Sequence, residues 1–264
     1  MAVRGFGVRT TNHRLSITNY QPATRRRKNT GTTTSSVTNI PVTVSSSETT
    51  TALAYRAAAR AVAGATFVLA HGAGAGQQSA FITDFARGLS DRGVDVLTFN
   101  FLYSEQRRHV PDRTAKLEAC YRAAIGAAQQ HFGRLDVFIG GKSMGGRIAT
   151  YLAAADDADA LAIRGVVALG YPLHPPGKPQ QLRSAHLPKI RVPLLIVQGE
   201  RDPFGTPDEL RPILDALSAP VTLHVVAGSD HYLAASRQKD RVAATYVGLQ
   251  ELIAGWIHAQ DKQG

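Results

Sequence analysis

Apolar runs alternate with segments of helical periodicity from about residue 50 to residue 258. The runs are continuous rather than alternating, which is typical of parallel strands covered on both faces. They predict strands at 65–70, 94–99, 135–140, 163–170, 193–199 and 221–228. The segment 50–57 is expected to form an antiparallel strand at one edge of the sheet.

The segments between these runs place apolar residues on one helical face. Phe81, Ile82, Phe85 and Leu89 share such a face, and Gly93 ends that helix. Further helices are predicted at 112–132, from Ser143 to about 155, at 206–218 and at 242–257. Strands that alternate with helices of this length predict an α/β fold, in which a mostly parallel sheet carries helices on both faces.

Composition separates residues 1–47 from the rest of the 264-residue chain. This segment is rich in Ser and Thr, holds seven basic residues and has no Asp or Glu, so we predict a disordered basic leader before a folded domain at 48–264. The alternatives are an overlong start, an organelle transit peptide or a phosphate-binding arm. We therefore expect a cytoplasmic protein, or an organellar one if the leader is a transit peptide.

The net charge of +10 resides mainly in this leader, because the remainder has 23 basic and 20 acidic residues. A nearly balanced folded domain is not expected to bind nucleic acid. The single cysteine, Cys120, excludes an intramolecular disulfide and a cysteine-based zinc site, and its apolar helix face predicts a small core residue. No apolar run approaches the ~18 residues that cross a membrane, and we predict no metal or cofactor.

The predicted strand at 135–140 leads into Gly-Lys-Ser-Met-Gly at 141–145 and then into a helix. A serine at the apex of such a turn is a nucleophile in the G-x-S-x-G pattern, although alone it could be a helix N-cap. Asp202 and His231 follow two later strands, in the chain order Ser143, Asp202, His231 that such a triad takes. Asp230 is the competing acid, but neighbours on a loop seldom face each other, so we favour Asp202.

The loop at 71–76, His-Gly-Ala-Gly-Ala-Gly, follows another predicted strand. Its small residues let backbone N–H groups approach an oxyanion, together with the N–H of Met144. His71 is expected to anchor this loop, and Lys142 either attracts an acidic substrate or packs in its loop. The loop lacks G-x-G-x-x-G spacing, and Asp136 stands where a P-loop needs glycine, so both phosphate-binding interpretations fail.

The segments LAHGAGAG at 69–76, GGKSMGGR at 140–147, GERDPFG at 199–205 and GSDH at 228–231 together resemble the α/β-hydrolase superfamily. The likeness is to its small, nearly cap-less dienelactone-hydrolase-like members, in particular to the branch related to testis-expressed and NSL-complex-subunit-3-like proteins. It implies Ser143 as nucleophile, Asp202 as acid and His231 as base, with the N–H groups of Ala73 and Met144 as the oxyanion hole. True dienelactone hydrolases use cysteine where this chain has Ser143, which argues against a dienelactone substrate.

We therefore expect a serine hydrolase of small carboxylic esters or thioesters that acts through an acyl-enzyme. The alternative is a catalytically weak binding or scaffold module, the role of some relatives. Only residues 171–192 separate two of the predicted strands, which is too short for a full helical cap. The pocket for the acyl substrate should therefore be open, with candidate lining residues Tyr103, Tyr171, His174, Phe204 and Tyr232.

Overall fold

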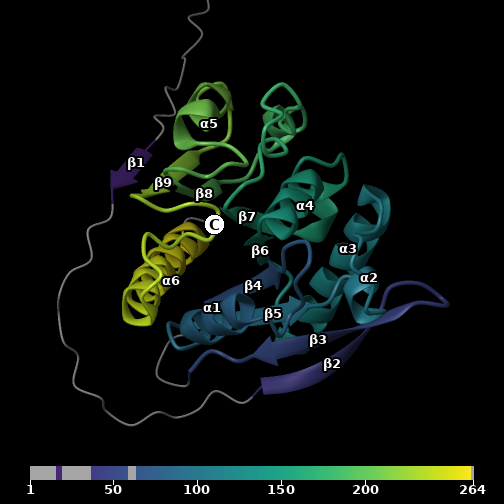
Figure 1. The fold of residues 1–264 in the computed structure, drawn as a ribbon. Coiled ribbons are helices and arrows are strands. Elements are labelled where there is room, and N and C mark those ends of the chain that lie inside the picture. Colours follow the sequence, from purple (N-terminus) through teal and green to yellow (C-terminus); the bar gives the residue numbers. More distant parts are fainter. Residues whose placement is uncertain (1–15, 20–36, 59–63, 263–264) are drawn as a thin grey trace, which may run out of the picture.

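The computed structural model describes residues 16–19, 37–58 and 64–262. Within them the chain forms one nine-stranded sheet in the order β1-β9-β8-β7-β6-β4-β5-β3-β2 (Figure 1). β2 and β3 are antiparallel to their neighbours, and the remaining pairs are parallel. The strands are β1 (Ser16–Asn19), β2 (Val37–Thr43), β3 (Thr49–Tyr55), β4 (Ala65–Ala70), β5 (Val94–Phe99), β6 (Val137–Lys142), β7 (Ile163–Leu169), β8 (Leu194–Gly199) and β9 (Val221–Val226).

Helices cover both faces of this sheet, which confirms the predicted α/β architecture. One apolar cluster joins the sheet to α1 and α6, and a second joins it to α3, α4 and α5 (Figure 1). Strands β4, β5 and β8 are buried along their whole length, as their largely apolar sequences predict. The helices are α1 (Ala80–Ser90), α2 (Leu102–Glu105), α3 (Thr114–Phe132), α4 (Met144–Ala153), α5 (Pro207–Leu214) and α6 (Lys239–Asp261).

Two predictions about the N-terminal part are wrong. The 50–57 strand is not at an edge, because β3 lies between β5 and β2. The domain boundary at residue 48 is too late, because β2 (Val37–Thr43) belongs to the sheet and lies inside the segment predicted to be disordered. An edge strand is held by backbone hydrogen bonds and can bury a single side chain, here Val42. Its sequence therefore lacks the apolar run by which the other strands were predicted. The prediction for 1–15 and 20–36 concerns residues outside those described.

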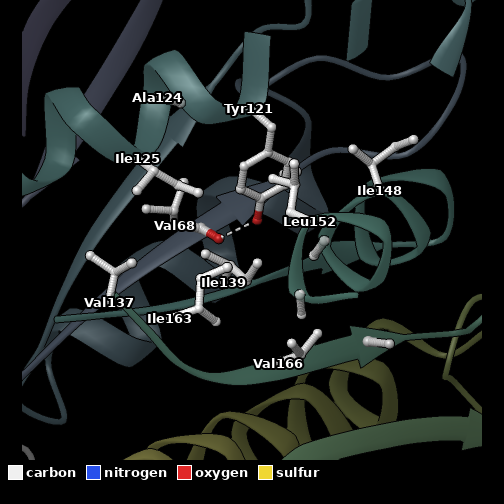
Figure 2. Packing of buried hydrophobic residues seen from close by; sticks show 14 of the residues in the cluster. Val68, Tyr121, Ala124, Ile125, Val137, Ile139, Ile148, Leu152, Ile163 and Val166 are labelled. Atoms are coloured by element: carbon white, nitrogen blue, oxygen red, sulfur yellow. Dashed lines mark hydrogen bonds between the residues drawn. The ribbon is translucent and has the colours of Figure 1, made fainter. Parts of the chain in front are cut away.

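The core on the α3 side holds the centre of the sheet in register. The hydroxyl of Tyr121 lies 2.8 Å from the carbonyl oxygen of Val68 on β4 (Figure 2). It also accepts a hydrogen bond from the N–H of Gly140 on β6 at 2.8 Å. Burial raises the pKa of this hydroxyl, so it stays protonated and can donate. Cys120, on the same helix, is buried as predicted, and burial raises the pKa of its thiol to about 12. This side therefore rigidly supports the end of β6, where Ser143 follows.

Candidate active site

Ser143 lies on a sharp turn between β6 and α4. Its backbone has φ of 52° and ψ of −115°, a conformation that residues other than glycine rarely adopt. The turn is possible because its two glycines have no Cβ. A Cβ on Gly141 would collide with the carbonyl oxygen of Ala70, and one on Gly145 would lie 2.6 Å from that same oxygen. The strained turn therefore holds the Ser143 hydroxyl clear of the backbone, as the G-x-S-x-G pattern predicts.

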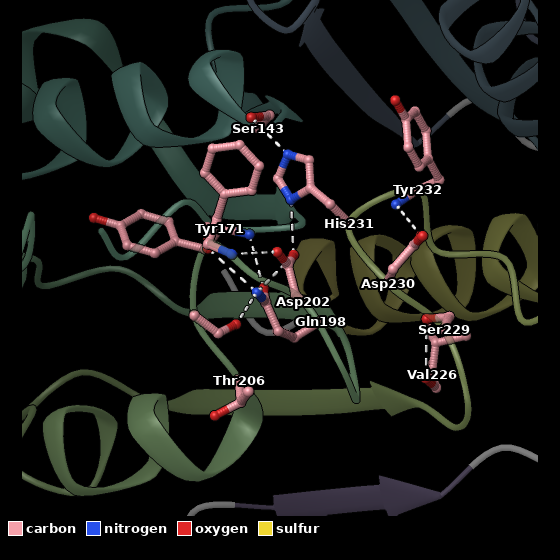
Figure 3. A network of polar contacts seen from close by, with 12 residues as sticks. Ser143, Tyr171, Gln198, Asp202, Thr206, Val226, Ser229, Asp230, His231 and Tyr232 are labelled. Atoms are coloured by element: carbon pink, nitrogen blue, oxygen red, sulfur yellow. Dashed lines mark hydrogen bonds and ion pairs between the residues drawn. The ribbon is translucent and has the colours of Figure 1, made fainter. Parts of the chain in front are cut away.

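Three remote loops bring Ser143, His231 and Asp202 into contact (Figure 3). His231 Nε2 lies 2.9 Å from Ser143 Oγ, and His231 Nδ1 lies 2.7 Å from Asp202 Oδ2. The carboxylate can only accept, so Nδ1 carries the proton and Nε2 is left to accept from the Ser143 hydroxyl. The ring of Phe204 packs on the imidazole at 4.3 Å between centroids. This arrangement can move a proton from the serine to the imidazole.

The competing acid, Asp230, takes another partner. It is exposed and accepts a hydrogen bond from the N–H of Tyr232 at 2.9 Å. Figure 3 shows its carboxylate directed to Tyr232 and away from the imidazole of His231. The structure thus pairs His231 with the buried Asp202, the acid favoured from the sequence.

The buried side chain of Gln198 holds Asp202 in place. Its amide nitrogen lies 3.0 Å from Asp202 Oδ2 and 2.7 Å from the carbonyl oxygen of Gly205, while its amide oxygen accepts from the N–H of Tyr171 at 2.8 Å. The second oxygen of Asp202 accepts from the N–H of Phe204 at 2.9 Å. Sequence reasoning missed Gln198. Its signal is one polar residue near the end of an otherwise apolar strand.

The loop after β4 packs against Ser143. A Cβ on Gly72 would lie 3.5 Å from Ser143 Cβ, so the loop backbone approaches the serine closely. His71 anchors the loop as predicted. Its Nδ1 donates to the carbonyl oxygen of Gly72 at 2.8 Å, and its Nε2 accepts from the N–H of Phe101 at 3.1 Å. Burial lowers the pKa of His71 to about 4, so its imidazole is neutral near pH 7 and holds the loop through these two hydrogen bonds.

A cavity of about 660 Å³ opens beside these groups. Ser143, His231, Ala73 and Met144 all contribute to its wall. Met144 is the first residue of α4, and its backbone N–H lies at the helix N-terminus, where the helix dipole favours a negative charge. The cavity therefore joins the serine, the imidazole and both residues predicted to supply oxyanion donors.

The matching family model is described as an alpha/beta hydrolase domain and covers residues 63–256. The chain belongs to this alpha/beta hydrolase family. The predicted superfamily is thereby confirmed, whereas the testis-expressed and NSL-complex-subunit-3-like branch stays a prediction.

Solved structures of α/β hydrolases share the fold of this chain. A dienelactone hydrolase from Anabaena variabilis is 19% identical, with a TM-score of 0.67, over 86% of this chain and 98% of that one. An α/β serine hydrolase without a lid from Xanthomonas campestris is 17% identical, with a TM-score of 0.64, over 87% and 98% of the two chains. The esterase domain of a Rhodothermus marinus protein is 16% identical, with a TM-score of 0.62, over 84% and 97%.

Three of the five predicted lining residues of this hydrolase-family chain lie elsewhere. Phe204 and Tyr232 line the cavity, as predicted. Tyr103 is buried and contributes instead to a neighbouring cavity of about 520 Å³. Tyr171 is fully buried and donates its hydroxyl hydrogen to the carbonyl oxygen of Arg183 at 2.6 Å. His174 is buried and lies 3.2 Å from Glu209. Tyr171 and His174 point inward because the short insert must close its own core.

Three cations line the cavity: Lys142, Arg147 and Arg183. Sequence reasoning singled out only Lys142. Burial lowers the pKa of Lys142 to about 8, although the charges of Asp202 and Asp230 act to raise it. Its Nζ lies 6.0 Å from the centroid of the Phe81 ring. Lys142 is therefore partly desolvated in the wall of the cavity and not a freely solvated side chain.

In the described part of the chain, no three His, Cys, Asp or Glu side chains group as metal ligands would. Nor does that part contain a helix with the length and apolar character of a membrane span.

Proposed function

We propose that this chain is a serine hydrolase that cleaves small carboxylic esters or thioesters through an acyl-enzyme on Ser143. The observation that carries the proposal is the continuous contact from Ser143 Oγ to His231 Nε2 at 2.9 Å and from His231 Nδ1 to Asp202 Oδ2 at 2.7 Å. Three residue types in this order and geometry activate a hydroxyl that is otherwise a poor nucleophile.

Acylation follows from the geometry. Ser143 Oγ attacks the carbonyl carbon while His231 Nε2 takes its proton, and Asp202 stabilises the imidazolium that forms. The N–H groups of Ala73 and Met144 stabilise the oxyanion, and one such donor contributes ~3 kcal/mol to lowering the barrier. The imidazolium then protonates the leaving alcohol or thiol as the bond to the carbonyl carbon breaks. Ser143 remains esterified.

Deacylation reverses these roles with water. His231 takes a proton from the water that attacks the acyl carbon, and returns it to Ser143 Oγ as the acid leaves. The short insert at 171–192 and the open cavity favour small acyl groups. The resemblance to solved esterases and hydrolases supports the fold that this chemistry uses.

A fluorophosphonate probe tests the nucleophile. The wild-type chain should be labelled, and Ser143→Ala should lose the label completely. Ser79→Ala is the matched control, because Ser79 lines the same cavity and should leave labelling unchanged. Labelling that persists in Ser143→Ala would overturn the proposal. A folded wild-type chain that neither takes the label nor cleaves short p-nitrophenyl esters would favour the alternative, a binding or scaffold module.

A further inference from the structure

Two arginines share the cavity with Ser143 and come from separate elements. Arg147 lies four residues after Ser143, and its N–H donates to the carbonyl oxygen of Ser143 at 3.0 Å in the first turn of α4. Residues four apart lie on the same face of a helix, so Arg147 projects from the side that carries the serine. Arg183 comes from the insert between β7 and β8. The fold therefore brings two guanidinium groups from separate elements to the wall of one cavity.

Neither guanidinium has an acidic partner within 4 Å among the described residues. Arg147 Nε is buried there without a hydrogen-bond partner, and its guanidinium lies 5.6 Å from the centroid of the Tyr151 ring. Arg147 as a whole is half-buried and lines the cavity, so Nε is the one buried donor of a cation that also faces the cavity. A buried donor without a partner is costly. The unused donor of Arg147 therefore points to a missing acceptor.

The two arginines also act on one another. The positive charge of Arg147 lowers the pKa of Arg183, after the larger effect of burial. The neighbouring His186 adds no charge, because burial and Arg147 lower its pKa to about 4. Like charges repel, and an anion bound between them would relieve that repulsion. The wall thus has the charge pattern of an anion site.

The acids near the cavity act on Lys142. Asp230 is the one carboxylate among the described lining residues. Both Asp230 and Asp202 act electrostatically on Lys142, the third cation, which lies beside them. Carboxylates of the protein therefore offset part of the cost of burying Lys142, whereas neither arginine has an acidic partner within 4 Å among the described residues.

We propose that Arg147 and Arg183 form an anion-binding subsite, separate from the oxyanion hole. The substrate is then an ester or thioester that carries an anionic group in addition to the bond that is cleaved. Arginine suits this role because its planar donors match the oxygens of a carboxylate or a phosphate. The inference rests on the proposed hydrolase function. It narrows that function from small esters in general to anionic ones.

The kinetic test compares two esters with equal acyl length. The p-nitrophenyl monoester of glutaric acid carries a terminal carboxylate, and p-nitrophenyl pentanoate does not. The wild-type chain should prefer the glutarate ester by kcat/KM, after subtraction of its spontaneous hydrolysis. Arg147→Gln and Arg183→Gln should each lower this preference about tenfold while changing pentanoate hydrolysis little, because a charged hydrogen bond is lost.

Matched variants separate this effect from net charge and from folding. Arg237→Gln removes one positive charge at an exposed position outside the cavity and should keep the preference. Arg147→Lys and Arg183→Lys keep the charge and should restore part of it. Circular dichroism checks that each variant folds. If both esters are cleaved and the ratio is unchanged in the arginine variants, the subsite is overturned and the hydrolase proposal stands.

A binding test keeps the two proposals distinguishable. Calorimetry measures glutarate and, separately, inorganic phosphate binding to the wild-type chain and to the glutamine variants. Binding that is lost in both glutamine variants supports the subsite even if no ester is cleaved and no probe labels Ser143, a result that would overturn only the hydrolase. The tighter of the two anions identifies the chemistry of the natural group. Equal or absent binding in all proteins, with no ester preference, would overturn the subsite.

Discussion

The two sides of the cavity beside Ser143 differ in how completely their polar groups are matched. On one side, His231 and Asp202 have hydrogen-bond partners at every reactive atom, and Asp202 is almost fully buried. On the other side, Arg147 and Arg183 have no acidic partner in the described structure, and one buried donor of Arg147 is unused. The polar groups of the first side are fully paired within the protein, whereas those of the second side are not.

This difference separates two kinds of preorganisation. A catalytic group must already be oriented when the substrate arrives, so its hydrogen bonds are made within the protein. A recognition group must instead keep its donors available, and it accepts a cost in stability to do so. Substitutions on the first side should therefore lower kcat, and those that leave a buried partner unsatisfied should also lower the free energy of unfolding. Those on the second should damage selectivity alone.

The largest effect is expected for Asp202→Asn. An amide in place of the carboxylate can donate to His231 Nδ1, which forces the proton to Nε2 and leaves Ser143 without a base. In a serine protease with this arrangement, the equivalent change lowers kcat about 10⁴-fold. We expect a loss of similar size in kcat for p-nitrophenyl butyrate, with the circular dichroism spectrum unchanged.

Asp230→Asn is the control for this experiment. Asp230 is exposed and bonded to the N–H of Tyr232. Its amide variant should keep kcat within about threefold of wild type, as surface substitutions generally have small effects. A large loss in Asp230→Asn together with a small loss in Asp202→Asn would exchange the two roles and contradict the assignment.

Gln198→Leu should have the next largest effect. Leucine fills a similar volume but leaves the N–H of Tyr171 and the carbonyl oxygen of Gly205 without their side-chain partner. Each buried group left unsatisfied costs about 1–3 kcal/mol, so we expect about 3 kcal/mol less free energy of unfolding by urea denaturation. The value of kcat should fall as well, because Asp202 loses a donor. Unchanged stability would show that Gln198 only fills space.

Local geometry explains how far the site could be predicted. The Ser143 turn depends on Gly141 and Gly145, which lie within two residues of it, so its pattern is visible in the sequence. Asp202 and His231 follow strands that are mostly apolar in sequence, and parallel strands bring their carboxyl ends to one edge. Each of these features depends on nearby residues or on strand order alone.

Features that depend on where a side chain points could not be predicted in this way. Tyr171 and His174 come from the correct insert, yet both are buried in the core. The insert residues that line the cavity are Pro172 and Arg183. β2 was missed for another reason, since its pairing uses backbone groups that leave no trace in composition.

Lys142→Met should show a smaller effect that depends on pH. The pKa of Lys142 falls from its ordinary 10.5 to about 8 on burial. Between these values the unfolded chain binds the proton and the folded chain does not, so this group makes wild-type stability rise with pH across that window. At pH 7 the buried charge weakens the fold, and Lys142→Met should be the more stable protein.

Urea denaturation at pH 7, 8, 9 and 10 measures this difference. The advantage of Lys142→Met over wild type should shrink as the pH rises toward 10. Lys178→Met, at an exposed position of the insert, controls for the loss of one charge and should show no such trend. An advantage that stays constant with pH would mean that the acids on this side fully offset the burial of Lys142.

The smallest effect is expected for Arg183→Gln on the free energy of unfolding. Whether that free energy rises or falls tests whether Arg183, unlike Asp202, lacks partners within the protein. Removing one of two repelling cations should leave the free energy of unfolding unchanged or raise it by roughly 0.5 kcal/mol, as for exposed charge pairs. The fold keeps the Tyr171 hydrogen bond, because that bond goes to the backbone carbonyl oxygen of Arg183 and not to its side chain. Added salt should reduce any gain, since it screens the repulsion in the wild-type chain. A loss of 1 kcal/mol or more would place Arg183 among the structural residues, because a side chain whose removal weakens the fold already has its partners within the protein.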